Sequence, residues 1–192
     1  MANGHLGQIA TPAAGNRVLA DVDWIADNAV FAGRYPGNDA YLAWLSERAE
    51  HAGRCQFVVA PDVVGNAEET LALSAPMTPR IRMLGFWVAL VAQDGLERLS
   101  VPWADIDCLF IGGTTEWKLG PAAQGLAAEA KEQGKWVHMG RVNSWERLRY
   151  ARHIGCDSVD GTYLAFGPDK NLPRLQRWLT EVNDQGLLWE AL

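Results

Sequence analysis

The sequence predicts a compact (β/α)8-type TIM barrel in which some helices are short or missing. Short apolar runs rich in Val, Ile, Phe and Trp recur along the chain, and each is followed by a polar or glycine-containing turn and an amphipathic stretch. Such runs are too short for helices and are typical of buried parallel strands, joined here by crossover helices. The length of 192 residues suits one domain, residues 1–192, with a substantial core.

Six strand-and-helix units follow one another along the chain. The expected strands lie within residues 24–31, 55–64, 86–93, 107–113, 136–140 and 157–166. The helical stretches lie within residues 39–51, 66–75, 95–100, 120–134, 144–155 and 171–183. A further strand is expected near residues 7–11 or 17–23. Both an open doubly wound sheet and a closed barrel fit this order, and seven or eight strands favour the barrel.

The helical stretches carry apolar residues at helical spacing. One face of residues 39–51 is formed by Tyr41, Leu42, Trp44 and Leu45. Glycines follow two of the stretches, Gly134 and Gly155, where a helix commonly ends in the left-handed conformation. Because barrels of this kind usually need about 250 residues, the shorter chain implies that some helices are reduced.

Composition indicates a protein of a reducing, cytoplasmic compartment. Hydrophobic residues make up 48% and charged residues 21%, and no apolar run approaches the roughly 20 residues that span a bilayer. Residues 1–16 have neither a cationic head nor a long apolar stretch, so no secretion signal is expected. The three cysteines are widely spaced and stand at apolar runs, so we expect buried thiols and neither a disulfide framework nor a zinc site.

The net charge of −6 argues against binding of nucleic acid over the whole surface. It leaves room for a local basic groove. Four arginines stand close together in the sequence, namely Arg141, Arg147, Arg149 and Arg152. A solvated helix face explains them equally well on sequence grounds.

Polar residues stand where the expected strands end. In a β/α barrel the chemistry occurs at the carboxyl ends of the strands. Taken strand by strand, these positions hold Asp27, Asp62, Gln93, the Gly112–Gly113 pair, Met139–Gly140 with Arg141, and Asp160. Carboxylates without accompanying histidines or cysteines favour covalent or acid–base chemistry over zinc binding. Asp157 and Asp160 are three apart, so only one can face the barrel interior, and Asp160 is expected to do so.

The order of these residues resembles that of the tRNA-guanine transglycosylases. It is more closely similar to their phage and bacterial relatives that insert 7-deazaguanines into DNA, the DpdA-like group. The resemblance covers about residues 24–160 and rests on six short segments in the family's order: ADNAVF, VAPDVV, ALVAQDG, LFIGGTTEW, VHMG and GCDSVDG. It implies a base-exchange enzyme, a pentosyltransferase that replaces guanine by a 7-deazaguanine without a metal or other cofactor.

The resemblance also implies residue roles. Asp160 is the expected nucleophile, which forms a covalent bond to the sugar, and Asp27 is the expected general acid and base. The guanine-like base would be bound by Phe31 and Met139 on its two faces, and along its edge by Asp62, Gln93, Gly112, Gly113, Thr114 and Gly140. His138 is interpreted as a strand residue rather than a catalyst, because Met139 is expected to take the pocket side of that strand.

The expected partners are DNA, single-stranded or with a flipped-out guanine, and a free 7-deazaguanine base. A base inside a duplex cannot reach such a pocket. Candidate contacts to the nucleic acid are Arg34, Trp117, Lys118 and Arg141. A homo-oligomer or an accessory subunit is compatible with the sequence, and a phage gene product acting in the host cytoplasm would suit DNA modification.

The chain departs from the family pattern at three places. Ala29 and Val30 replace a Gly-Gly pair in the loop under the base. The zinc module of the tRNA enzymes has no counterpart, and the segment after Asp160 lacks the arginine of their anticodon-reading loop. The last two departures favour DNA over tRNA as the substrate.

Three alternatives stay open at this stage. The chain could act on tRNA with RNA-binding parts supplied by a partner subunit. It could be a catalytically idle barrel that binds a base or serves as a scaffold. A sugar-phosphate barrel fits least well, because it would need a Gly-rich phosphate loop late in the chain, and GPDK is a poor candidate for one.

Overall fold

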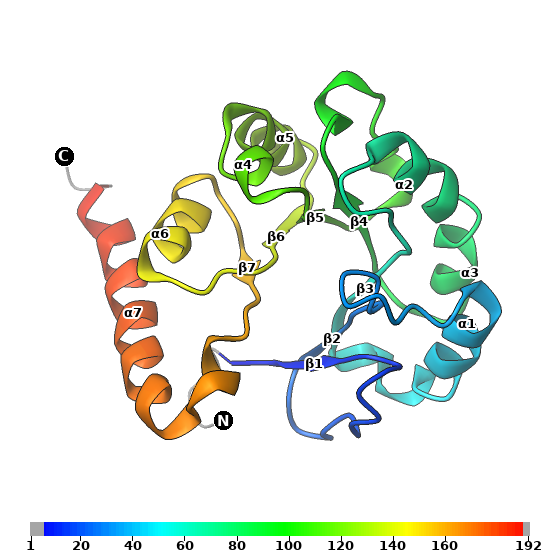
Figure 1. Cartoon of the computed structure of the whole chain (residues 1–192), viewed down its shortest axis with the longest axis horizontal. Coiled ribbons are helices and arrows are strands. Elements are labelled where there is room, and N and C mark those ends of the chain that lie inside the picture. The colour runs from blue at the N-terminus through cyan, green and yellow to red at the C-terminus, as the bar shows by residue number, and fades with distance from the viewer. Residues whose placement is uncertain (1–5, 190–192) are drawn as a thin grey trace.

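The computed structural model describes residues 6–189, and side chains as far as residue 183. The start of the segment examined for a secretion signal, residues 1–5, therefore lies outside the described residues. Within them, seven parallel strands form one sheet in sequence order: β1 (Gln8–Ala10), β2 (Trp24–Ala26), β3 (Cys55–Val59), β4 (Val88–Ala92), β5 (Cys108–Ile111), β6 (Trp136–Met139) and β7 (Ser158–Val159). The strands curl around a common centre and the helices lie outside them (Figure 1).

The helices that cover this sheet are α1 (Asn38–Ser46), α2 (Ala67–Ser74), α3 (Thr78–Met83), α4 (Thr115–Lys118), α5 (Pro121–Glu132), α6 (Trp145–His153) and α7 (Pro168–Trp189). Short 3-10 turns add η1 (Ala49–Arg54), η2 (Leu96–Arg98), η3 (Trp103–Asp105) and η4 (Tyr163–Phe166). No α-helix joins β1 to β2, and only η2 and η3 join β4 to β5. The prediction of a TIM-type barrel with reduced helices is confirmed.

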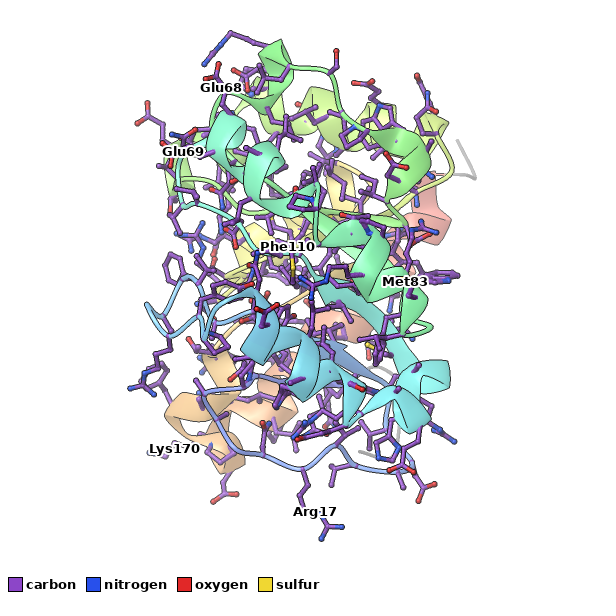
Figure 2. The ribbon with its side chains drawn as sticks, turned by 90° about the vertical axis from the view of Figure 1, so that its right-hand side faces the viewer. Arg17, Glu68, Glu69, Met83, Phe110 and Lys170 are labelled. Atoms are coloured by element: carbon purple, nitrogen blue, oxygen red, sulfur yellow. The ribbon has the colours of Figure 1, made fainter. Side chains whose placement is uncertain are left out.

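Two apolar layers hold the fold together. The inner layer consists of side chains that point toward the barrel centre, namely Ile25, Phe57, Val59, Ala89, Val91, Cys108 and Phe110. Phe110 lies deep inside the molecule, whereas Met83 on α3 lies at its edge (Figure 2). The outer layer packs the alternate strand residues, such as Leu109 and Ile111, against the helices. This alternation follows from the two-residue period of a strand.

Local signals in the sequence explain where the helices begin and end. Asn66, Thr114 and Ser144 cap three helices, because the side chain of each accepts a hydrogen bond from a backbone N–H three residues later. Gly134 and Gly155 have φ of 68° and 87°, so both adopt the expected left-handed conformation after α5 and α6. These short caps turn the chain quickly back into the next strand.

The sheet is open between its first and last strands. In the part of the chain that the structure describes, β1 pairs only with β2 and β7 pairs only with β6. Residues 7–11 supply the seventh strand, and residues 17–23 form a loop. A cleft of about 670 Å³ lies at this seam, lined by Ile9 of β1 and Val159 of β7.

Candidate functional site

The polar residues at the strand ends lie at one mouth of the barrel, because all the strands are parallel. Asp27 follows β2 directly, Asp62 follows β3 after two residues, and Gln93 follows β4 directly. Gly112 follows β5, Gly140 follows β6 and Asp160 follows β7. The placement expected from the sequence is therefore observed for all six positions.

Asp62 is fixed by two side-chain amides. The Nδ2 group of Asn28 donates to Asp62 Oδ1 at 2.8 Å and to the carbonyl of Ala60 at 2.8 Å. The Nε2 group of Gln93 donates to Asp62 Oδ2 at 2.6 Å. Burial raises the pKa of Asp62, and the hydrogen bonds from Asn28 and Gln93 oppose that rise. Sequence reasoning missed Asn28, although its place beside Asp27 at the end of β2 could have signalled it.

Gln93 is oriented by its carbonyl oxygen as well as by its amide. Gln93 Oε1 accepts hydrogen bonds from the backbone N–H groups of Gly65 at 2.8 Å and Gly113 at 3.1 Å. A Cβ on Gly112 would lie 2.5 Å from Val91, so only glycine fits there. The side-chain amide of Gln93 is therefore aimed at Asp62, and the N–H of Gly113 already has a partner in the free protein.

Asp27 occupies a tight turn after β2. Its Oδ1 accepts a hydrogen bond from the N–H of Ala29 at 2.7 Å. Ala29 has a φ of 63°, the left-handed region that favours glycine. Burial raises the pKa of Asp27; the bond from Ala29 opposes this rise, and the negative charges of Asp160 and Asp62 add to it. A carboxyl group in this environment tends to hold its proton.

The surroundings of Asp160 lower its pKa, whereas those of Asp27 raise it. Its Oδ2 lies 3.1 Å from His138 Nε2, and its Oδ1 accepts a hydrogen bond from the N–H of Arg141 at 2.9 Å. Burial alone would raise the pKa of Asp160, but His138, the N–H of Arg141 and the positive charge of Lys118 outweigh it, so the pKa is lowered. The carboxylate form is therefore favoured at this position.

The orientation expected for β6 is wrong. Met139 is completely buried in the outer apolar layer, among residues that face the helices. His138 points inward, where its ring centroid lies 4.6 Å from that of Phe110 and 5.1 Å from that of Phe57. Because successive strand residues face opposite sides, Met139 cannot line the same pocket as His138. Strand register, which places His138 beside Phe110, decides the face.

Phe31 lies at the mouth with 66% of its surface exposed. The guanidinium of Arg141 lies over its ring, with Cζ 4.6 Å from the ring centroid. The same guanidinium donates to the carbonyl of Gly112 at 3.1 Å and to that of Gly113. One residue therefore joins the Phe31 loop, the Gly112–Gly113 segment and, through its backbone, Asp160.

Of the other residues expected to contact nucleic acid, one is exposed and one is buried. Arg34 is exposed in the loop between β2 and α1. Lys118 is fully buried, so it is not available to phosphates; its Nζ donates to the carbonyl of Gly140 at 2.5 Å. Burial, with Arg141 and Arg147 nearby, lowers the pKa of Lys118 to about 8. The sequence analysis expected Lys118 to contact nucleic acid, but α4 places its side chain in the interior.

Thr114 and Trp117 stabilise the loop that follows β5. Asp94 Oδ2 accepts from the Thr114 N–H at 2.7 Å, and the Thr114 hydroxyl donates to Asp94 Oδ1 at 2.6 Å. Trp117 is half-buried against the outer layer, and its indole N–H donates to Glu97 at 3.0 Å. Both residues thus brace the Gly112–Gly113 segment in the free protein. Sequence reasoning missed Asp94, which follows Gln93 directly.

The seam cleft reaches the same site from the side. Its inner lining includes Ile25, Trp136, His138 and Asp160, and Trp178 of α7 lies on its outer side. Asp160 keeps 18% of its side-chain surface exposed, while His138 keeps 2%. The carboxylate is therefore open to solvent, whereas the histidine is shielded.

The described residues form neither a metal-binding group nor a membrane-spanning helix. Among them, no three His, Cys, Asp or Glu side chains are grouped as a metal-binding set. Within the same range, no helix has the length and apolar character that crossing a membrane requires.

Comparison with known proteins bears on the fold. No protein-family model matches the chain, and no curated protein matches it. The chain is similar to the Bacillus subtilis YkuI protein with an EAL domain, solved with its substrate c-di-GMP and calcium: 14% identity, TM-score 0.51, covering 88% of this chain and 45% of that one. It is also similar to a protein described as a glycerophosphoryl diester phosphodiesterase from Silicibacter pomeroyi: 14% identity, TM-score 0.48, covering 83% and 51%. The chain thus spans about half the length of each, and the first likeness is one of fold, a barrel of the TIM type.

Proposed function

We propose that this protein is an enzyme, a transglycosylase that replaces guanine by a 7-deazaguanine in DNA through a covalent aspartyl–sugar intermediate. One observation carries the proposal: the pKa of Asp160 is lowered while that of Asp27 is raised, at one barrel mouth. Two carboxyl groups pushed apart in this way suit a nucleophile and a general acid. The resemblance of the strand-end residues to the transglycosylases supports the same roles.

The reaction is a double displacement. Asp160 attacks C1′ of the target nucleotide, the bond from C1′ to the base breaks, and the base leaves with the electron pair. Asp27 donates a proton to the leaving guanine. Asp27, now ionised, takes a proton from the incoming 7-deazaguanine, which attacks C1′ and releases Asp160. Two inversions at C1′ give retention overall.

The base site is formed by groups that are already positioned to meet the edge of guanine, which carries hydrogen-bond donors and an acceptor. Each oxygen of Asp62 keeps a free lone pair beside its bond from Asn28 or Gln93, and can accept from the N–H groups of guanine. The exposed ring of Phe31 offers one stacking face once the side chain of Arg141 moves. Met139 is not proposed for the other face, because it lies behind the sheet.

The nucleic acid must present its base outside a duplex, because the site lies inside the barrel mouth. Arg34 and Arg141 are the basic residues proposed to contact phosphates, and Lys118 is not among them. The overall charge of −6 favours a local contact over a broad basic surface. An accessory subunit or a second copy of the chain could supply further basic residues.

The deciding experiment is exchange of labelled guanine into DNA and into bulk tRNA by the wild type, Asp160→Asn and Asp157→Asn. Asp157 lies at the start of β7 and pairs with Lys131, away from the mouth, so it is the matched control. We expect label in DNA with the wild type and Asp157→Asn, and none with Asp160→Asn. Label only in tRNA would keep the reaction and change the substrate. Base binding without exchange into either would indicate a binding barrel.

A second measurement tests the intermediate itself. Incubation with a single-stranded oligonucleotide should leave a covalent adduct that survives denaturation and is located on Asp160 by mass spectrometry. The Asp160→Asn variant should form none. An active enzyme without any adduct on Asp160 would contradict the proposed nucleophile.

A further inference from the structure

A chain of hydrogen bonds runs behind Asp160 and is not used in the reaction described above. The indole N–H of Trp136 donates to Ser158 Oγ at 2.8 Å. Ser158 Oγ lies 2.7 Å from His138 Nδ1, and His138 Nε2 lies 3.1 Å from Asp160 Oδ2. All four residues belong to β6, β7 or the residue that follows β7, so the sheet register fixes their spacing.

The donors and acceptors of these groups are matched by one arrangement of their protons. Ser158 has one hydroxyl proton, and its oxygen already accepts from Trp136. Within the described residues, the other hydrogen-bond partner of this hydroxyl is His138 Nδ1, and donation of the Ser158 proton to Nδ1 uses the hydrogen-bonding capacity of both groups. In that arrangement Nδ1 is the acceptor nitrogen, and Nε2 carries the ring proton toward Asp160.

We propose that His138 is a positioning residue: Ser158 and Trp136 hold it as the neutral imidazole with its proton on Nε2, and this N–H orients Asp160 for attack. The inference rests on the proposed role of Asp160 as nucleophile. His138 does not touch the substrate, because only 2% of its side chain is exposed. Its ring packs against both Phe57 and Phe110, which restricts how it can rotate.

A neutral donor suits a nucleophile better than a cation does. When Asp160 forms an ester, its negative charge disappears. An ion pair with an imidazolium would lose most of its attraction at that point, whereas a neutral N–H can still donate to the ester carbonyl oxygen. The N–H of Arg141 holds the other oxygen, Oδ1, which is then the one that forms the bond to C1′.

The titratable and charged groups around Asp160 come from several elements. His138 belongs to β6, Arg141 follows β6, Lys118 lies on α4 and Asp27 follows β2; each interacts with the charge of Asp160. Removing the His138 donor should therefore raise the pKa of Asp160, while Arg141 and Lys118 continue to oppose the rise. The acid limb of the pH–rate profile should move to higher pH by the same amount.

The test combines an observation that needs no activity with a kinetic one. Nitrogen-15 NMR of the wild type should show His138 with its proton on Nε2 near neutral pH, and carbon-13 NMR should show the Asp160 carboxyl titrating at higher pH in His138→Leu. His138→Leu should lower kcat for guanine exchange about 10- to 100-fold, with KM for DNA unchanged. His138→Gln, whose Nε2 amide can donate from a similar position, should recover most of kcat.

Each outcome has a definite meaning. A proton on Nδ1, a charged ring at neutral pH, or His138→Leu with full kcat and an unshifted Asp160 would overturn the inference. If the NMR results hold but the wild type exchanges no base, the proposed function fails and the His138 assignment stands. If His138→Leu does not fold, Ser158→Ala serves instead. In this variant the ring proton of His138 should no longer be confined to Nε2, and kcat should fall. A proton that stays on Nε2 in Ser158→Ala would overturn the role of Ser158.

Discussion

The guanidinium of Arg141 lies over the ring of Phe31, with 4.6 Å between Cζ and the ring centroid. It also donates to the carbonyls of Gly112 and Gly113, so a flat, hydrogen-bonding group covers the aromatic face in the free protein. A purine that stacks on Phe31 has to displace this side chain. The structure therefore describes a closed form of the proposed base site.

Removing the guanidinium should tighten binding of the free base. Arg141→Gly keeps the backbone N–H that holds Asp160, and glycine accepts the φ of 61° at this position. Because a cation–π contact is worth about 0.5–1 kcal/mol, we expect guanine to bind about 2- to 5-fold more tightly by calorimetry. Arg34→Ala, at an exposed site, is the control and should leave the affinity unchanged. Weaker binding by Arg141→Gly would mean that the guanidinium itself binds the base.

Asp27→Asn should remove activity but increase stability at neutral pH. Burial raises the pKa of Asp27, so the folded state favours its protonated form. The stabilising effect of that proton is present at acidic pH and is lost as the pH rises through the folded-state pKa. Asparagine is neutral throughout and its Oδ1 can still accept from Ala29.

Thermal unfolding between pH 3.5 and 7 measures this difference. We expect the Tm of Asp27→Asn to exceed that of the wild type at pH 7, by about 2–4 °C for each 1 kcal/mol gained, and to approach it at pH 3.5. Asp157→Asn, which loses the pair with Lys131, should instead melt lower at pH 7. A lower Tm for Asp27→Asn at pH 7 would contradict the raised pKa.

Lys118→Met should change how stability depends on alkaline pH. The pKa of Lys118 falls from 10.5 to about 8 through burial and the nearby arginines. Between these values the unfolded chain binds a proton that the folded chain does not, so stability rises with pH. Relative to Lys118→Met, the wild type should gain on the order of 3 kcal/mol from pH 8 to 10.5.

Urea unfolding of both proteins across that range gives the comparison. Lys131→Met, which removes a lysine paired at the surface with Asp157, controls for other groups that titrate there. Parallel curves for the wild type and Lys118→Met would show that Lys118 is solvated like an ordinary lysine.

Substitutions at Met139 and at Phe31 should affect different properties: stability in the first case and base binding in the second. Met139 is fully buried in the outer layer, so Met139→Ala should cost about 2–5 kcal/mol of unfolding free energy, and Met139→Leu less than about 1.5 kcal/mol. Neither should alter guanine affinity in the folded protein. Phe31→Ala should weaken binding about 5- to 100-fold with little change in Tm, because Phe31 is exposed. A loss of affinity in Met139→Leu equal to that in Phe31→Ala would restore Met139 to the base site.

Much of the site follows from the order of residues in the chain. Strand runs alternate with helical stretches, and in a parallel barrel every strand ends at the same mouth. Asp27, Asp62, Gln93 and Asp160 could therefore be placed together before any coordinates were known. The spacing of Asp157 and Asp160 allowed only one of them to face inward, and Asp160 was expected to do so because it is nearer the end of the strand.

What the sequence by itself determined is the parallel barrel with reduced helices and the set of polar groups at its mouth, because hydrophobic period and strand order are local properties of the chain. Only the tertiary structure decided which face of β6 points inward, since a shift of one residue in register exchanges His138 for Met139. It also decided that Lys118 is buried and that Arg141 covers Phe31. These contacts join residues far apart in the chain, and their geometry depends on how strands pack side by side.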